Sequence, residues 1–222
     1  MHRGHEVAAG KSAAGDRAVV AAQLGRHPRA MRTVAHRCPC GLPDVVETAP
    51  RLEDGTPFPT LYYLTCPRAT AAVGRLEASG LMGEMTARLL SDPGLAAGYR
   101  AAHERYLDRR EQIGQVPEIA GISAGGMPTR VKCLHVLVAH ALAAGPGANP
   151  LGDEALAALP PWWDRGACVP PGAVVSEASA PGEAVGSGDS GNAGDSGDAG
   201  DSGDPRDSGG AGDSGGAGEA VG

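Results

Sequence analysis

The sequence predicts an α+β fold in which a small antiparallel sheet packs with several helices. Two observations carry this prediction. Short runs of β-branched and aromatic residues lie before residue 67, and apolar residues recur at helical spacing after it. The strand runs are residues 31–36, 45–48 and 60–66, and the turn signal Asp54-Gly55-Thr56-Pro57 separates the last two. Strands this short, joined by turns, are expected to pair antiparallel.

The helices are predicted in order along the chain. Asp16 is expected to cap a helix over residues 17–24, and Gly25 to close it. Two apolar segments with helical spacing lie on either side of Ser79-Gly80. Asp92 followed by proline predicts the start of a long helix, whose apolar face is Leu95, Tyr99, Ala102, Tyr106, Arg110 and Ile113. A later helix is expected from residue 128 to about 144, then a turn at 156–159, after which Trp162-Trp163 dock on the core.

Charge and composition set the domain organisation. The chain has 222 residues and a net charge of −7, and every charged residue after position 170 is acidic except Arg206. We expect residues 1–16 to be disordered, residues 17–165 to form one domain, and residues 166–222 to be a disordered acidic tail. The tail is the candidate region for binding a protein partner. The near-neutral domain argues against nucleic-acid binding. The lack of a long apolar run argues for a cytoplasmic protein without a membrane span.

The cysteines indicate a metal site. Four of the five lie in three short stretches, HRCPCG at 36–41, TCP at 65–67 and KCLH at 132–135. If residues 36–40 are extended, His36, Cys38 and Cys40 point to one side. Cys66 is expected at the end of a neighbouring strand. Five cysteines in a reducing compartment favour ligation, catalysis or burial over disulfides.

The preferred ligands are Cys38, Cys40, Cys66 and Cys133, with His36 as the substitute. They would hold zinc or an iron–sulfur cluster. In a helix starting at residue 128, Cys133 and His135 lie on nearly opposite faces, so Cys133 alone is expected to bind the ion. Cys168, close to the tail, is expected to take no part. Simple burial of the cysteines as small apolar side chains stays open as the alternative.

A second candidate site is the glycine-containing loop at residues 125–132. A loop that enters a helix presents free N–H groups to an anion. We therefore predict anion binding by Gly125, Gly126, Thr129, Arg130 and Lys132, although the spacing matches no known phosphate-binding motif. Cys133 is also a candidate nucleophile, with His36 or His135 as its base, because a helix start and basic neighbours lower the pKa of a thiol.

Three stretches of this chain, residues 36–43, 54–67 (DGTPFPTLYYLTCP) and 121–142 (GISAGGMPTRVKCLHVLVAHAL), closely resemble a bacterial family known as domain of unknown function 501. The likeness runs from about Val19 to Trp163 and leaves out the acidic tail. The resemblance implies a family domain over this range but no activity.

The leading functional hypothesis is a cytosolic protein that binds a metal ion or iron–sulfur cluster through its cysteines, with a structural or redox-sensing role. The first alternative is an enzyme that acts on a phosphorylated or anionic small molecule at residues 125–132. The second is a plain interaction protein with buried cysteines. Whether the protein is an enzyme is left open by the sequence.

Overall fold

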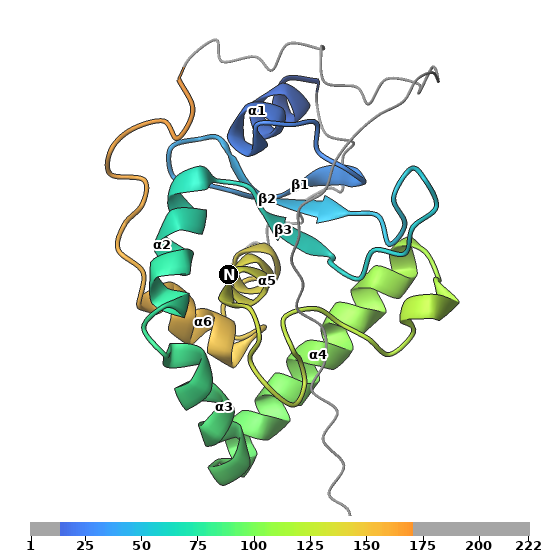
Figure 1. Ribbon diagram of the computed structural model, residues 1–222, viewed down its shortest axis with the longest axis vertical. Helices are drawn as coiled ribbons and strands as arrows, with labels where there is room; N and C mark the ends of the chain where they lie inside the picture. The colour runs from blue at the N-terminus through green and yellow to red at the C-terminus, as the bar shows by residue number, and fades with distance from the viewer. Residues whose placement is uncertain (1–13, 171–222) are drawn as a thin grey trace, which may run out of the picture. The chain divides into compact units, whose positions relative to one another are not determined.

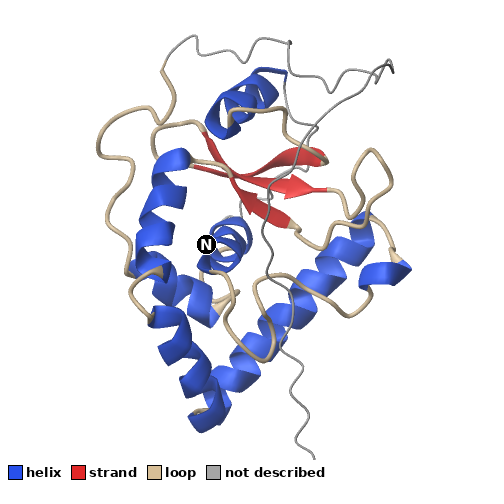
Figure 2. Ribbon diagram, in the orientation of Figure 1, coloured by secondary structure: helices blue, strands red, loops and turns tan. Residues whose placement is uncertain are grey.

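The computed structural model describes residues 14–170, and this part of the chain confirms the α+β prediction. It holds a three-stranded antiparallel sheet, six α-helices and one short 3-10 helix. Helix α1 (Ala14–Leu24) covers one face of the sheet, and α5 (Leu134–Ala144) lies against the other, surrounded by the remaining helices (Figure 1). The sheet thus lies between an outer layer, which is α1, and an inner layer formed by the remaining helices (Figure 2).

The sheet has the order β1-β2-β3 and is built around a fully buried central strand. Strand β1 (Met31–Arg37) pairs with β2 (Pro43–Thr48), which pairs with β3 (Tyr62–Leu64). Successive side chains of a strand point to opposite faces. Val46 accordingly packs with Val20 of α1 and Met31, whereas Val45 belongs to the main core around α5.

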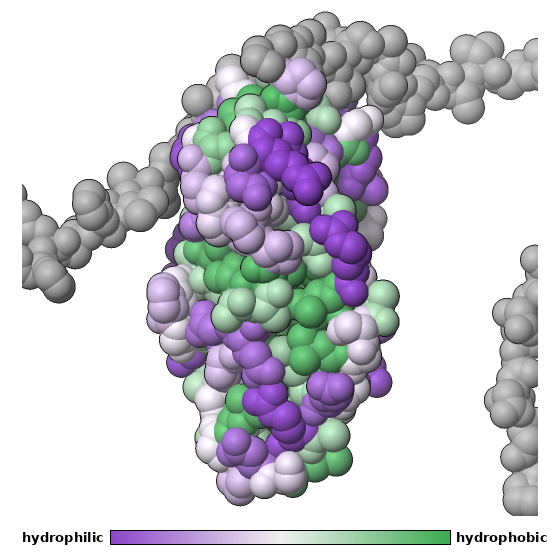
Figure 3. All heavy atoms as spheres, turned by 90° about the vertical axis from the view of Figure 1, so that its left-hand side faces the viewer, coloured by the Kyte–Doolittle hydropathy of each residue, from purple (hydrophilic) through white to green (hydrophobic). Residues whose placement is uncertain are grey.

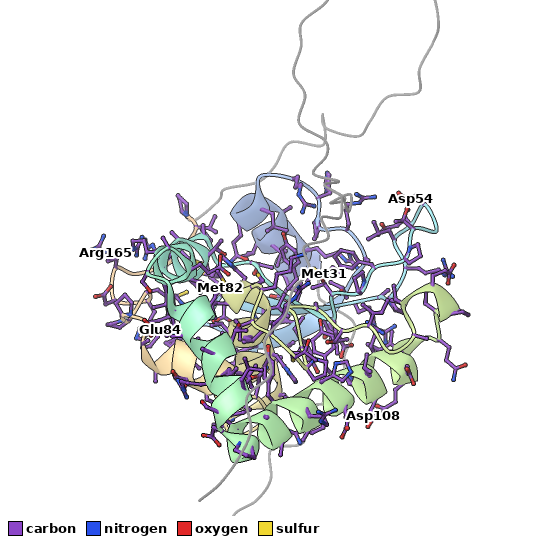
Figure 4. All side chains as sticks on the ribbon, turned by 60° about the horizontal axis from the view of Figure 1, so that its bottom comes forward. Met31, Asp54, Met82, Glu84, Asp108 and Arg165 are labelled. Carbon is purple, nitrogen blue, oxygen red and sulfur yellow. The ribbon has the colours of Figure 1, made fainter. Side chains whose placement is uncertain are left out.

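The inner layer contains α2 (Pro67–Glu77), α3 (Leu81–Ser91), α4 (Pro93–Ile113) and α6 (Pro150–Ala157), with the 3-10 turn η1 (Pro117–Ile119) after α4. Asp92 caps α4 by accepting the N–H of Leu95 at 2.9 Å, as predicted. Four residues of the predicted face of α4 are buried, namely Tyr99, Ala102, Tyr106 and Arg110. Exposed charged residues such as Asp108 lie on its outer side (Figure 4).

Arg110 shows how a charged residue is held in this core. Its guanidinium donates to the carbonyl oxygens of Pro59, Ile119 and Ile122 at 2.5–3.1 Å, and only 2% of the residue is exposed. Burial lowers the pKa of Arg110 below its ordinary value. The three hydrogen bonds connect the C-terminal end of α4 to the loop between β2 and β3 and to the segment that follows α4.

Several element boundaries differ from the predictions. Helix α1 begins at Ala14, so Asp16 lies in its first turn and not at its cap. β3 has only three residues, because Cys66 already caps α2. α5 begins at Leu134 and not at residue 128, because a tight loop with a cis Met127–Pro128 peptide precedes it. The predicted turn at 156–159 contains the last two residues of an eight-residue helix, α6, which is capped by Asn149.

The ends of the predicted domain organisation lie largely outside the described residues. This holds for residues 1–13 and for the acidic tail from residue 171 onward. Residues 166–170, assigned to the tail, are described, and Cys168 packs against the main core. Within residues 14–170, no helix is long and apolar enough to cross a membrane.

Candidate metal-binding sites

The first two cysteines lie in the turn that joins β1 to β2. Strand β1 ends at Arg37, so the alternation of an extended strand does not reach them. The N–H of Gly41 donates to the carbonyl of Cys38 at 2.8 Å, and the N–H of Cys38 donates to Leu42 at 2.9 Å. Gly41 has a φ of 86°, which favours glycine. This turn, and not strand alternation, brings Cys38 and Cys40 close enough for each thiol to affect the pKa of the other.

His36, the predicted substitute ligand, is engaged elsewhere. Its Nδ1 lies 2.7 Å from Oδ1 of Asp44, a fully buried carboxylate on β2. His36 and Asp44 therefore form a side-chain pair across the two strands.

Cys66 and Cys168 meet the first two cysteines from distant parts of the chain. Cys66 is fully buried at the N-cap position of α2, and the nearby thiol of Cys168 acts on its pKa. Cys168 also contacts Cys40, and its Sγ accepts the side-chain N–H of Gln23 at 3.2 Å. Cys38, Cys40, Cys66 and Cys168 thus form one group, the thiol cluster. Cys168 was expected to take no part in a site, and sequence spacing gives no sign that the chain returns to this region.

Burial dominates the electrostatics of the thiol cluster. It raises the pKa of Cys38 to about 11 and that of Cys168 to about 12, and it raises the pKa of Cys66. Burial also acts to raise the pKa of Cys40, but hydrogen bonds from the Leu42 backbone and from neighbouring thiols outweigh it and lower the pKa. A buried cation would offset the charge of the thiolates and so favour deprotonation of all four.

Unpaired polar atoms concentrate beside the thiol cluster. Four buried side-chain polar atoms of the described residues have no hydrogen-bond partner, and three of them are Gln23 Oε1, Asp44 Oδ2 and Thr65 Oγ1. Gln23 contacts Cys168, Asp44 acts on Cys38 through its charge, and Thr65 directly precedes Cys66. Buried polar atoms are normally paired, so their concentration marks this region as unusual.

Cys133 lies in a different place from the thiol cluster. It caps α5, and its Sγ lies 3.9 Å from Nδ1 of His135. Oε1 of Glu77, the last residue of α2, lies 3.1 Å from the same nitrogen. We call Glu77, Cys133 and His135 the Glu–Cys–His cluster. Cys66 caps the opposite end of α2, an 11-residue helix that spans roughly 16 Å at about 1.5 Å per residue.

The predicted ligand set is therefore divided between two sites. The expectation that Cys133 and His135 point apart was also wrong, because α5 begins after Cys133 and the helical geometry does not apply to it. Contact with Cys133, followed by the charge of Glu77, raises the pKa of His135 to about 9. Glu77 was missed because it lies 56 positions before Cys133 in the sequence, and no motif joins the two.

The predicted anion site is a tight loop before α5. The N–H groups of Arg130 and Lys132 donate to Gly126 and Gly125, and the N–H of Val131 donates to Thr86 Oγ1 at 3.0 Å. Gly125 and Gly126 have φ of 73° and 92°, and they leave no room for a Cβ. The exposed residues of the loop are Thr129, Arg130 and Lys132. Anion binding by these residues stays a prediction, but the three N–H groups are already occupied.

A cleft of about 290 Å³ lies between α2 and the segment that follows α6. Its lining includes three arginines, Arg68, Arg75 and Arg165, together with Trp162. Arg165 lies at the edge of the molecule (Figure 4). The face that carries α2 has a hydrophobic band across its middle, between hydrophilic regions (Figure 3). Packing of this segment on α2 is what brings Cys168 to Cys66.

The comparisons with known proteins identify a family. The family model described as a protein of unknown function (DUF501) matches residues 34–157. The chain belongs to this family. Its matched range contains the whole Glu–Cys–His cluster and three members of the thiol cluster, whereas Cys168 lies beyond it. Neither the curated proteins nor the solved structures gave a match.

Proposed function

We propose that this DUF501 protein binds one zinc ion through the four sulfurs of the thiol cluster, and that the ion has a structural role. One observation carries the proposal. Four thiols from three segments that are distant in sequence gather in one region of the fold: Cys38 and Cys66 lie in the main core, Cys40 and Cys168 pack against it, and each thiol acts on the pKa of another. Four thiolates without an open position are the usual ligands of structural zinc.

A single zinc ion would require the thiols to lie close together. Two thiolates on one zinc ion lie roughly 3.8 Å apart, given bonds of about 2.3 Å in a tetrahedron. The inorganic sulfides of an iron–sulfur cluster would hold its cysteines further apart. Among the described residues, the group with all ligand atoms within 4.8 Å of one another is Glu77, Cys133 and His135. The sulfurs of the thiol cluster therefore lie further apart than these three atoms, and zinc would draw them together.

A structural ion here would link three parts of the chain that are distant in sequence. It would join the β1–β2 turn, the start of α2 and the segment after α6. Because the unfolded chain offers no preformed site, most of the binding free energy would appear as stability. Zinc would also stabilise the thiolates of Cys38, Cys66 and Cys168 in a buried environment that otherwise favours their protonated forms.

Elemental analysis of protein purified without oxygen tests the proposal. We expect zinc in the wild type, and the loss of about one zinc per chain, with a lower melting temperature, in Cys38→Ser and Cys168→Ser. Cys133→Ser is the matched control, because it removes a thiol outside the cluster and should keep both this ion and the melting temperature of the wild type. Zinc content that is the same in all four proteins would contradict the proposal. Finding iron together with sulfide would identify an iron–sulfur cluster in place of zinc. Metal-free protein would support the alternative that the cysteines are simply buried.

A further inference from the structure

We propose that the Glu–Cys–His cluster is a second, independent metal site. Glu77 Oε1, Cys133 Sγ and His135 Nδ1 would bind a divalent transition-metal ion, with zinc as the best match, and leave one coordination position open to solvent. The site does not depend on the thiol cluster, with which it shares no residue.

The distances are close to those of a metal site. The three ligand atoms all lie within 4.8 Å of one another. In a tetrahedral zinc site with the usual bond lengths, sulfur and nitrogen ligands lie roughly 3.6 Å apart, and nitrogen and oxygen ligands roughly 3.3 Å apart. The corresponding distances here are 3.9 Å from Cys133 Sγ to His135 Nδ1 and 3.1 Å from that nitrogen to Glu77 Oε1. Small side-chain movements would therefore complete the site.

The surrounding hydrogen bonds hold the ligands in suitable orientations. His135 Nε2 lies 3.2 Å from the carbonyl oxygen of Thr70, which can only accept, so Nε2 keeps a proton and Nδ1 is the nitrogen at which an ion would displace the proton. The N–H of Leu134 donates to Glu77 Oε1 at 2.6 Å and fixes the carboxylate. Metal-binding histidines and carboxylates characteristically have such outer partners. Cys133 occupies the N-cap position of α5, directly beside the residue whose N–H holds the Glu77 carboxylate.

The same geometry argues against Cys133 as the nucleophile of a catalytic triad. In a triad the nucleophile contacts one nitrogen of the histidine, and the carboxylate contacts the other. Here Cys133 and Glu77 both contact Nδ1, while the second nitrogen is occupied by Thr70. Three different ligand atoms directed at one point indicate ion binding.

The composition and exposure of the site indicate an open coordination position. Three protein ligands with mixed sulfur, nitrogen and oxygen donors are typical of zinc sites that keep a fourth position for water. The side chains of His135 and Glu77 remain 28% and 23% exposed, so solvent reaches the cluster. A water or a small anion would take this position. Such an ion lowers the pKa of its water and polarises carbonyl or phosphoryl groups, and these are the substrate classes that the site would suit.

Metal titration of the full-length protein tests this site. We expect zinc affinity at the cluster to fall more than about 100-fold in Cys133→Ser and His135→Gln, a larger effect than the loss of an outer partner. Glu77→Gln should also weaken binding, although its amide oxygen can still accept the N–H of Leu134 and preserve the fold. His103→Gln is the matched control, because His103 is a half-buried histidine bonded to Ser123 Oγ and not to this cluster.

Cobalt spectroscopy gives a readout that a merely structural role would not change. In the Cys168→Ser protein, in which the thiol cluster has lost its ion, added Co²⁺ should give a sulfur-to-cobalt absorption band that a further Cys133→Ser substitution removes, which separates this site from the thiol cluster. Azide should alter the visible spectrum by entering the open position. Equal metal affinity in the wild type, Cys133→Ser and His135→Gln would overturn the site. A spectrum insensitive to azide would overturn its open position.

Discussion

Acid is expected to destabilise this protein through His140, a histidine buried in the middle of the core. The residue is 2% exposed and lies between two tyrosine rings, with ring centroids 5.7 Å from Tyr62 and 5.2 Å from Tyr106. The side-chain N–H of Asn149 lies 3.3 Å from its Nδ1, a geometry that suits a neutral imidazole accepting a hydrogen bond. Burial, and then the charge of Arg105, lower the pKa of His140 from 6.5 to about 4.

The direction and size of the effect follow from proton linkage. Between about pH 6.5 and pH 4 the unfolded chain binds a proton at His140 and the folded chain does not, so acid favours unfolding. The stability contributed by the neutral form is complete above pH 6.5 and is lost as the pH falls through the folded pKa. With each pKa unit worth about 1.4 kcal/mol, the full contribution is about 3 kcal/mol, of which roughly 2.5 kcal/mol is lost by pH 4.5.

Urea unfolding of the wild type and His140→Gln at pH 7 and pH 4.5 measures this contribution. The glutamine keeps an acceptor for Asn149 but does not titrate, so the difference between the two pH values should shrink by roughly 2.5 kcal/mol. His27→Gln is the matched control, because His27 is exposed on the loop after α1 and its loss should leave that difference unchanged. An identical pH dependence in the wild type and His140→Gln would refute the argument.

Three further predictions concern the fold. Tyr106→Phe should lower the free energy of unfolding in urea by about 1–3 kcal/mol, because the N–H of Leu61, 2.6 Å from the hydroxyl, loses its buried acceptor; an unchanged value would contradict this. Gly126→Ala should lower the melting temperature more than Gly147→Ala, since both have positive φ but only a Cβ at Gly126 would lie 2.7 Å from a backbone oxygen. Asp92→Ala should cost about 1 kcal/mol by removing the cap of α4, and urea unfolding would detect it.

The local parts of the fold were predictable because they depend on neighbouring residues. The cap at Asp92 and the buried stripe through Tyr99 and Tyr106 follow from helical spacing and from a short side-chain contact. The start of α5 was predicted at the wrong place. Its position depends on a loop in which Gly125 and Gly126 pack against the chain that follows them, and sequence spacing does not reveal such packing.

The candidate sites were only half predictable from the sequence. Residue type identified Cys38, Cys40 and Cys66 as candidate ligands, because thiols beside prolines and glycines are typical of such sites. The fold separates Cys133 from these three cysteines. Cys133 was chosen and Cys168 set aside, although the fold places Cys168 against Cys40 and Cys66.

The sequence by itself determined the fold class, the long helix α4, the cysteines as candidate ligands and membership of the DUF501 family. Only the tertiary structure decided which ligands meet. Spacing shows which way a side chain points within one element, but contacts between elements depend on how distant segments pack. Helix α2 demonstrates the reason, because its two ends hold Cys66 and Glu77 roughly 16 Å apart and so divide the cysteines between two sites.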